Sequence, residues 1–474
     1  MRHVAHVLLA LVATLASVNL RAQAPREPDW PRLEAETLQH FQALLRLDTS
    51  NPPGHEKLAV DYLKQILERE GIPVRIFALE ADRPNLVARL PGSGRRPPVL
   101  LMGHTDVVNV DPAKWTHPPF SATREGGYVY GRGTLDDRPH LVGGLMTMIM
   151  LKRLNVPLDR DVIFLAESGE ESTTRVGIDF MVKEHYDAIG AEYCFAEVGT
   201  TARIGGRVRY AAIETAEKIP RPLELTARGT SGHGSIPLQG NAIVRLARAV
   251  AALGAWRTPI RLNDTTRAYF SRLADLSAPE AAARYRSLLA PDSPAASAAD
   301  AWLMEHEPAH ASMLRTSVSP TILNGGYRFN VIPSDAKATI DVRMLPDEDP
   351  ARFLAAVRQV IDNPAVDVAY STAVDQRASG ATARLDSDAF RAIEAAVTRH
   401  YEAVTLPMML NGATDMAFVR ARGMQCYGFG PAVDVEDAAK GFGPHSDQER
   451  ILESELHRFV RFQWDIVVDL ASAR

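Results

Sequence analysis

Residues 98–106 read Pro98-Val99-Leu100-Leu101-Met102-Gly103-His104-Thr105-Asp106, and this stretch decides both the fold class and the place of the site. Its apolar run is typical of a buried strand, and polar side chains follow as soon as the run ends. The same arrangement recurs where Asp161-Val162-Ile163-Phe164-Leu165-Ala166 precedes Glu170-Glu171. Because open α/β sheets gather ligands just beyond the carboxyl ends of their strands, we expect these polar side chains to meet. The sequence therefore predicts an α/β fold with its site at one edge of a sheet.

Five separated positions supply candidate metal ligands. Two histidines with carboxylates suit zinc or a neighbouring divalent ion, and the set lacks the thiolates of a structural zinc site. Three or more acidic ligands can hold two ions with one carboxylate bridging, and such a pair polarises a carbonyl and activates a water. Asp106 lies two residues after His104, so both side chains face the same way in an extended segment and Asp106 can accept the second ring N–H. The five positions are His104, the pair Asp136-Asp137, the pair Glu170-Glu171, Glu197 and His445.

The order and surroundings of these residues resemble the cocatalytic dizinc family that includes aminoacylase, carboxypeptidase G, carboxypeptidase S, acetylornithine deacetylase and succinyl-diaminopimelate desuccinylase. The resemblance spans almost the whole chain after its N-terminal segment. Any one motif is a weak signal, and their joint order is a strong one. The motifs are Gly103-His104-Thr105-Asp106, Tyr130-Gly131-Arg132-Gly133-Thr134-Leu135-Asp136-Asp137, Glu170-Glu171, Ala196-Glu197-Val198-Gly199, Gly232-His233-Gly234-Ser235-Ile236-Pro237, Asn330-Val331-Ile332-Pro333 and Pro444-His445-Ser446-Asp447-Gln448-Glu449-Arg450.

The resemblance implies a role for each candidate ligand. Asp136 would bridge two zinc ions in each subunit, with His104 and Glu197 on one ion and Glu171 and His445 on the other. Cobalt or manganese could substitute for zinc. The chain departs from the family pattern in three places without losing a ligand: Arg138-Pro139 stands where Lys-Gly is common, Gly169 where an acid usually precedes the glutamate pair, and Val198-Gly199 after the fourth ligand position.

The resemblance also assigns the catalytic groups around the ions. It makes Glu170 the general base, with Asp106 beside it in the catalytic set as the partner of the histidine ring. It further implies a cis peptide bond between Asp136 and Asp137. His233 would stabilise the developing oxyanion in the active site of a partner subunit, although a histidine in a glycine-rich turn can equally be a plain loop residue.

Four further positions are candidates for binding the substrate. Arg343 would clamp a substrate carboxylate, because its planar guanidinium suits two parallel hydrogen bonds. A strand residue with an ordinary salt-bridge partner is the alternative. Asn330, Gly412 and Thr414 would add hydrogen bonds to the substrate, and the alternative for Thr414 is the N-cap of the helix that follows.

The chain divides unevenly. Alternating helix and strand patterns over residues 25–218 and 376–474 predict a zinc-hydrolase catalytic domain with a mixed sheet flanked by helices. Residues 219–375 interleave strand-like runs with helices over 241–255 and 350–360, which indicates an inserted ferredoxin-like α+β domain. An alanine-rich stretch over about 265–314 looks like an extra helical insertion within it. The resemblance implies that the inserted domain is a lid that pairs in a homodimer.

Composition agrees with a large enzyme. At 474 residues, 46% hydrophobic and 23% charged, the chain can bury the cores of two domains. A net charge of −5 and a pI near 6.3 leave no basic surplus for nucleic acid. Beyond the N-terminus, no stretch approaches the roughly 20 apolar residues that span a bilayer, so we expect no membrane partner once the signal is removed.

The N-terminus predicts export. Arg2 and two histidines precede the apolar run Val7 to Ala16, and Ala22-Gln23-Ala24 follows as a cleavage site, so residues 1–24 are interpreted as a signal peptide. An uncleaved anchor is the alternative. We expect a periplasmic or extracellular enzyme. Its two cysteines, Cys194 and Cys426, provide no disulfide framework and are expected to be buried free thiols.

The resemblance implies hydrolysis of an amide bond beside a free carboxylate in a small-molecule substrate. A carboxypeptidase-like activity on the terminal residue of a peptide is the leading hypothesis, and an N-acyl-amino acid amidohydrolase is the alternative, because the shape of the pocket distinguishes them. A zinc-binding or peptide-binding relative without turnover is a third hypothesis. Glu170 argues against it, since a non-catalytic protein has little reason to keep a base beside an intact ligand set.

Overall fold

The computed structural model describes residues 27–372, 377 and 380–473. The predicted signal peptide, residues 1–24, lies outside this range. Within the described residues, no helix combines the length and the apolar character needed to cross a bilayer.

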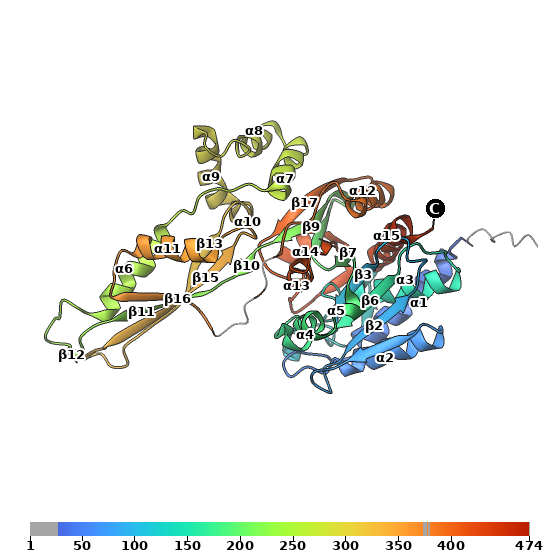
Figure 1. Ribbon diagram of the computed structural model, residues 1–474, viewed down its shortest axis with the longest axis horizontal. Helices are drawn as coiled ribbons and strands as arrows, with labels where there is room; N and C mark the ends of the chain where they lie inside the picture. Colours follow the sequence, from blue (N-terminus) through green and yellow to red (C-terminus); the bar gives the residue numbers. More distant parts are fainter. Residues whose placement is uncertain (1–26, 373–376, 378–379, 474) are drawn as a thin grey trace, which may run out of the picture.

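A mixed ten-stranded sheet forms the centre of the larger domain (Figure 1). Its strands run in the order β1-β2-β6-β3-β7-β18-β9-β8-β19, with β17 paired to β9. β3, β6 and β7 are parallel neighbours, whereas β1, β2 and β8 join in antiparallel fashion. The bounds are β1 (Val74–Phe77), β2 (Asn85–Leu90), β3 (Val99–His104), β6 (Val162–Glu167), β7 (Tyr193–Ala196), β8 (Gly199–Ile204), β9 (Arg207–Glu217), β17 (Val404–Leu410), β18 (Gln425–Gly428) and β19 (Ala432–Asp434).

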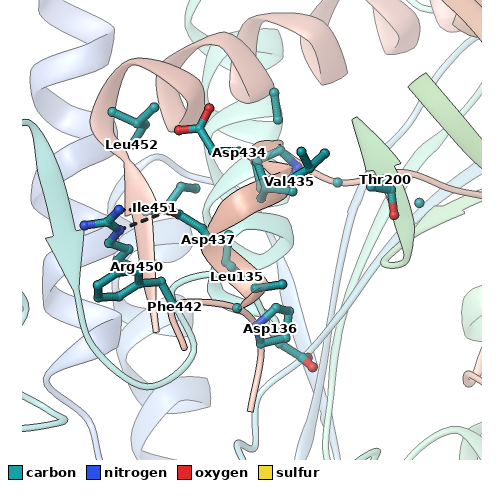
Figure 2. A pocket seen from close by; sticks show the side chains of 18 of the residues that line it. Leu135, Asp136, Thr200, Asp434, Val435, Asp437, Phe442, Arg450, Ile451 and Leu452 are labelled. Atoms are coloured by element: carbon teal, nitrogen blue, oxygen red, sulfur yellow. Dashed lines mark hydrogen bonds and ion pairs between the residues drawn. The ribbon is translucent and has the colours of Figure 1, made fainter. Parts of the chain in front are cut away.

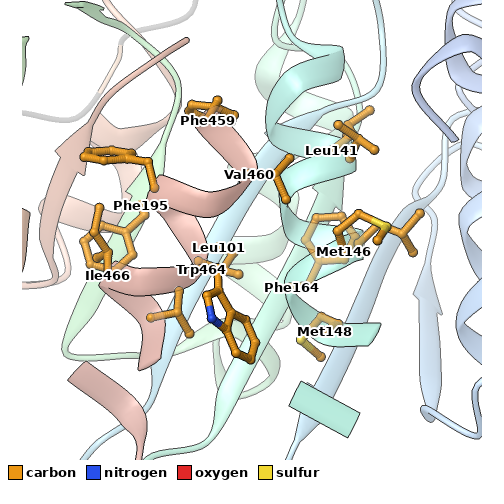
Figure 3. Close-up of a cluster of buried hydrophobic side chains, with 14 of the residues drawn as sticks. Leu101, Leu141, Met146, Met148, Phe164, Phe195, Phe459, Val460, Trp464 and Ile466 are labelled. Atoms are coloured by element: carbon orange, nitrogen blue, oxygen red, sulfur yellow. The ribbon is translucent and has the colours of Figure 1, made fainter. Parts of the chain in front are cut away.

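Helices cover both faces of this sheet because its central strands are apolar on both sides. Leu101 packs under one set of helices, whereas Leu100 and Met102 pack under the other. Figure 3 shows the first core, where Phe164 of β6 packs beside Met146 and Trp464. The first set is α1 (Trp30–Leu45), α2 (Lys57–Arg69), α3 (Arg138–Arg153), α12 (Asp388–Tyr401) and α15 (Glu453–Ala471), and the second is α4 (Ile178–Glu184), α5 (Tyr186–Ile189) and α13 (Met416–Arg420).

The inserted domain has the ferredoxin-like topology that the sequence predicts. Four antiparallel strands run in the order β16-β11-β15-β13, with the short β10 also paired to β15. Two helices pack on this sheet and bury a separate apolar core. In chain order the elements are β10 (Ile219–Pro220), β11 (Leu223–Arg228), α6 (Ala242–Ala255), β13 (Ser317–Gly325), β15 (Asp335–Met344), α11 (Pro350–Ile361) and β16 (Val366–Tyr370). We call this domain the lid.

The alanine-rich stretch is helical, as predicted, but it packs in a different place. The sequence pattern grouped it with the lid, whereas its apolar residues pack against β9 and β17 of the ten-stranded sheet, with Phe270 and Leu314 beside Leu406 and Met409. These helices cover apolar positions of β9 and β17. They are α7 (Asp264–Asp275), α8 (Pro279–Ser287), α9 (Pro294–His306) and α10 (Pro308–Met313).

Several short elements shape the rim of the site. The last helix begins at Glu453, because Arg450–Leu452 form β20 against β5 (Tyr128–Tyr130). The other rim elements are β4 (Thr123–Glu125), α14 (Val435–Ala439) and, on the lid, β12 (Gly232–His233) and β14 (Val331–Ile332). Cys194 and Cys426 lie opposite each other on β7 and β18 as buried free thiols, as predicted.

Candidate metal centre and active site

The candidate ligands converge at the carboxyl edge of three neighbouring parallel strands. His104 ends β3, Glu170 and Glu171 lie in the turn after β6, and Glu197 directly follows β7. Asp136 comes from the loop before α3, and His445 from the loop between α14 and β20. The expectation that strand ends bring these residues together is confirmed.

Asp136 lies between the two histidines. Its Oδ1 is 2.8 Å from His104 Nε2, and its Oδ2 is 3.1 Å from His445 Nε2. Glu171 Oε1 is 3.1 Å from His445 Nε2, and Glu197 Oε2 is 3.7 Å from His104 Nε2. Asp136 thus lies between two groups of side chains, one with His104 and Glu197 and the other with Glu171 and His445.

Electrostatics favour cations in this site. Burial raises the pKa of Glu197 to about 8, and burial together with the charge of Glu197 raises the pKa of Glu170 well above its ordinary value. Hydrogen bonds to Asp136 and Glu171 raise the pKa of His445 to about 10. In the absence of cations, burial therefore favours protons on Glu170 and Glu197, whereas the hydrogen bonds from the two histidines hold the pKa of Asp136 below its ordinary value. Divalent cations bound by the deprotonated ligands would replace those protons.

Asp106 is buried beneath the site and positions two of its parts. Its Oδ1 is 3.3 Å from His104 Nδ1, as expected for a partner of the ring. It also accepts the backbone N–H groups of Gly169 at 3.1 Å, Glu170 at 3.3 Å and Glu171 at 3.0 Å. Asp106 therefore orients the ring of His104 and holds the turn that carries Glu170 and Glu171.

Glu449 has a role that its motif does not reveal. Its buried carboxylate accepts hydrogen bonds from Arg132 Nη1 and from the backbone N–H groups of Gly133, Leu135 and Asp136. All four donors belong to the loop that ends at Asp136. Glu449 therefore holds this loop in place, and it lies four residues after His445.

The adjacent residues Asp136 and Asp137 make different contacts. The peptide bond between the two residues is cis, as predicted. Asp137 Oδ2 accepts the backbone N–H of His104 at 3.2 Å, and its Oδ1 is hydrogen-bonded to the ring of His140. Of the two, only Asp136 therefore contacts the ring nitrogens of His104 and His445. Arg138 is fully buried and donates to the backbone carbonyl of Thr105 at 2.7 Å, so it holds the backbone directly after β3.

Arg377 lies in the site, and sequence reasoning missed it. Its Nη2 is 3.7 Å from Glu170 Oε1, and its Nη1 is 3.9 Å from Asp415 Oδ1. Asp415 is buried, and burial with the nearby charge of Glu170 raises its pKa well above its ordinary value. No motif surrounds Arg377, which comes from the connection between the lid and the larger domain.

The structure does not bring the lid residues to the metal cluster of the same chain. His233 is exposed on β12, which Figure 1 shows at the end of the lid remote from the ten-stranded sheet. Asn330 lies beside it, since its carbonyl accepts the N–H of Gly234 at 2.8 Å. Arg343 pairs with Asp341 at 2.9 Å on its own strand, which is the ordinary salt bridge considered as its alternative role.

The two candidates from the loop before α13, Thr414 and Gly412, differ in their contacts. The hydroxyl of Thr414 donates to Glu217 Oε2 at 2.9 Å and accepts the N–H of Met416 at 3.2 Å. The hydroxyl of Thr414 therefore accepts the first N–H of α13 from the position before the N-cap residue, Asp415, and its proton is already used. Gly412 is half-buried in the preceding turn.

Comparisons with known proteins agree with this geometry. The model of peptidase family M20/M25/M40 matches residues 100–467. A probable succinyl-diaminopimelate desuccinylase of Staphylococcus aureus is 28% identical over 318 residues, which cover 67% of this chain and 70% of the relative.

Solved structures share the fold at low sequence identity. The M20 family metallo-carboxypeptidase Sso-CP2 from Sulfolobus solfataricus has a TM-score of 0.66 and 19% identity, covering 91% of this chain and 98% of that chain. The YXEP protein of Bacillus subtilis, a dinuclear metal binding peptidase from the M20 family, has a TM-score of 0.59 and 13% identity, covering 93% and 99%. The predicted fold class is confirmed. The chain belongs to peptidase family M20/M25/M40 and is a metal-dependent hydrolase of amide bonds in peptides or acyl-amino acids.

Proposed function

We propose that this hydrolase is a dizinc exopeptidase of the carboxypeptidase type, which cleaves the amide bond beside the free carboxylate of a peptide. The observation that carries the proposal is the position of Asp136, whose two oxygens lie 2.8 Å from His104 Nε2 and 3.1 Å from His445 Nε2. A carboxylate shared in this way suits a pair of divalent ions. Nitrogen and oxygen donors without thiolate favour zinc, with cobalt or manganese as substitutes.

The residues around the ions supply the proton transfers. His104, Asp136, Glu171, Glu197 and His445 would hold the ions, which would polarise the substrate carbonyl and bring the pKa of a water toward neutrality. Glu170 accepts the proton that the attacking water loses, and the oxygen of this water bonds to the acyl carbon. Glu170 then donates the proton to the amide nitrogen as the carbon–nitrogen bond breaks. A carboxylate oxygen of Glu170 belongs to one compact group with ligand atoms of His104 and Glu197, as this role requires.

Arginines would hold the free carboxylate of the substrate. Arg377, 3.7 Å from Glu170, places a guanidinium beside the base within the larger domain. Arg343 would join it from the lid by exchanging its partner Asp341 for the substrate. Both side chains are only partly buried, so a substrate can reach them.

A homodimer formed through the lid would complete the site. Within the described residues, β13 pairs on one side only, with β15, so it is an edge strand of the lid sheet. Apolar side chains near this edge are exposed, including Leu323 at 61% and Phe329 at 99%. An exposed apolar edge strand is suited to pairing with a second copy. The dimer would bring His233 to the metal centre of the partner, where it stabilises the oxyanion.

Export to the periplasm or the extracellular space is part of the proposal. It is supported by the N-terminal apolar segment followed by Ala22-Gln23-Ala24. Determining the N-terminal residue of the protein recovered outside the cytoplasm tests this point, and a mature chain that starts near residue 25 is expected.

A hydrolysis panel tests the activity. Purified protein would be loaded with zinc and offered dipeptides, tripeptides blocked at either end and N-acyl amino acids, with amine release as the readout. We expect turnover only of substrates with a free carboxylate beside the scissile amide. Equal turnover of substrates whose C-terminal carboxylate is amidated would contradict the proposal. An N-acyl-amino acid amidohydrolase is a second candidate, favoured by an apolar cavity that adjoins Asp136 and Glu197.

A further inference from the structure

The candidate metal centre is open on one side and closed on the other. On the open side, Asp136 borders a cavity of about 480 Å³ that α14 and β20 help to line (Figure 2). On the closed side, Asp106 is fully buried and contacts His104 and the turn that carries Glu170. Space for a substrate lies on the open side, so the ligands and the base are best held from the closed side.

Asp106 has one polar contact that the motif around His104 does not reveal. Its Oδ1 lies 3.3 Å from His104 Nδ1, and its two oxygens together accept the backbone N–H groups of residues 169–171. Oδ2 also accepts a hydrogen bond from Asn51 Nδ2 at 2.8 Å, the shortest of these contacts. A carboxylate accepts hydrogen bonds, so the NH2 end of the amide must face it. Asn51 precedes Asp106 by 55 positions, and no local pattern links the two residues.

Backbone contacts hold Asn51 in this position. Its N–H donates to the carbonyl of Val107 at 2.9 Å, and the N–H of Val107 donates to the carbonyl of Thr49 at 3.3 Å. Ser50 and Val107 thus form a parallel bridge just beyond the end of β3. The hydroxyl of Thr49 donates to the carbonyl of Thr105 at 2.7 Å. Residues 49–51 therefore extend the edge of the sheet beside the site, and Asn51 is only 4% exposed there.

We infer that Asn51 is a positioning residue for the ligand His104 and the base Glu170, and that it acts through Asp106. A carboxylate can rotate about the bond that joins it to its side chain, and the contacts of Asp106 are compatible with one orientation only. Asn51 holds Oδ2, so Oδ1 stays turned toward the ring of His104 and toward the turn of the base. Groups that orient the partners of metal ligands commonly matter for metal affinity and activity. The inference rests on the ligands and the base of the proposed function.

Asn51→Leu tests the inference in the zinc-loaded, full-length enzyme. Leu keeps the branched shape of the side chain but removes the donor to Asp106. Zinc affinity and kcat should each fall about 10-fold or more, as is typical when such support is lost. KM should change less than about threefold, because Asn51 acts on the ligand and the base rather than on the proposed substrate clamp. Wild-type zinc affinity and kcat in Asn51→Leu would overturn the inference.

Asn51→Asp is the second variant, and it keeps both the shape and the polarity of the side chain. It places an oxygen against Oδ2 of Asp106 in place of the donor, so the losses should be at least as large as in Asn51→Leu. Asn109→Leu is the matched control. The amide of Asn109 donates to the carbonyl of Pro52 at 2.9 Å, so it contacts the same loop from the exposed side. Zinc affinity and kcat should stay at wild-type values in the control, and equal losses in all three variants would overturn the role of the Asn51 amide.

Hydrogen exchange gives a readout that depends neither on zinc nor on turnover. In the metal-free protein, the amides of residues 169–171 are protected by Asp106. Asn51→Leu should speed their exchange about fivefold or more, because the carboxylate that accepts them becomes free to turn. Exchange of the β11 amides in the lid is the internal standard and should stay unchanged, as should exchange of residues 169–171 in Asn109→Leu. Wild-type exchange of residues 169–171 in both Asn51 variants would overturn the inference.

These measurements separate the inference from the proposed function. If exchange of residues 169–171 responds to Asn51→Leu while the wild-type enzyme hydrolyses no peptide, the proposed function fails and the contact between Asn51 and Asp106 keeps its positioning role. If the wild-type enzyme hydrolyses peptides while Asn51→Leu keeps wild-type exchange, zinc affinity and kcat, the inference fails and the proposed function stands.

Discussion

Replacing Glu449 by Gln tests whether one buried carboxylate holds the loop that carries Asp136. Glu449 Oε1 accepts the N–H groups of Leu135 at 2.7 Å and Asp136 at 3.2 Å, and Oε2 accepts Arg132 Nη1 at 2.7 Å and the N–H of Gly133 at 3.1 Å. Gln keeps the shape of the side chain but turns one oxygen into an amide NH2 group. In either orientation, two of the four donors lose their acceptor. A hydrogen bond to a charged group contributes about 1.5–3 kcal/mol, so the free energy of unfolding should fall by roughly 3–6 kcal/mol.

Two measurements check this expectation. Urea denaturation of the metal-free protein gives the loss of stability, and competition with a chelator gives zinc affinity, which should fall about 10–100-fold because Asp136 loses its support. Glu453→Gln is the matched control, since its ion pair with Arg124 has partly exposed side chains (24% and 51%) and contributes at most about 1 kcal/mol. Wild-type stability and zinc affinity in Glu449→Gln would refute the positioning role.

Three further outcomes follow from the structure. Glu170→Gln should retain zinc and lose about 10²–10⁴-fold or more in kcat, whereas Glu171→Gln should lose zinc. An active, zinc-loaded Glu170→Gln enzyme would show that another group is the base. Lys218 is buried, and burial lowers its pKa from 10.5 to about 7. Between pH 7 and pH 10.5 the unfolded chain therefore binds a proton that the folded chain does not, so the free energy of unfolding rises with pH. Urea denaturation should show that Lys218→Met removes a rise approaching ~1.4 kcal/mol per pH unit over this window, and an unchanged pH profile would contradict the shift. Leu323→Glu, at the exposed edge of the lid, should yield a monomer in sedimentation experiments and reduce kcat if His233 acts in the partner's site, so a fully active monomer would exclude that role.

The metal ligands could be predicted because local sequence marks them. His104 ends one apolar strand and Glu197 directly follows another, so their position at the sheet edge depends only on the strand ending where the apolar run ends. The lid was predictable for a similar reason, since its helices and strands alternate with clear periodicity. In contrast, Asp136 and Asp137 are adjacent and chemically alike, and only the course of the loop decides that Asp136 contacts the ring of His104 while Asp137 accepts the backbone N–H of His104.

Other features depend on contacts that no local pattern encodes. An amphipathic pattern over 265–314 shows that one face of each helix is apolar, but it does not say which surface will cover that face, and β9 and β17 provide it. Arg377 lies 3.7 Å from Glu170 although the two residues are far apart in the sequence and no motif surrounds Arg377. Thr414 follows Gly412 in a motif that suggests a substrate contact, yet its hydroxyl is used by Glu217, a residue almost two hundred positions earlier in the chain.

The position of the lid within the chain determines the order in which the metal site can be assembled. His104, Asp136, Glu171 and Glu197 all precede the lid, whereas His445 follows it. Synthesis proceeds from the N-terminus and domains fold as they emerge, so the half-site of His104 and Glu197 can form early. The half-site of Glu171 has no histidine until the strands after the lid have joined the sheet. Full occupancy of the proposed pair of ions would therefore mark completed folding, and a chain that stops within the lid would lack His445, one of the proposed ligands.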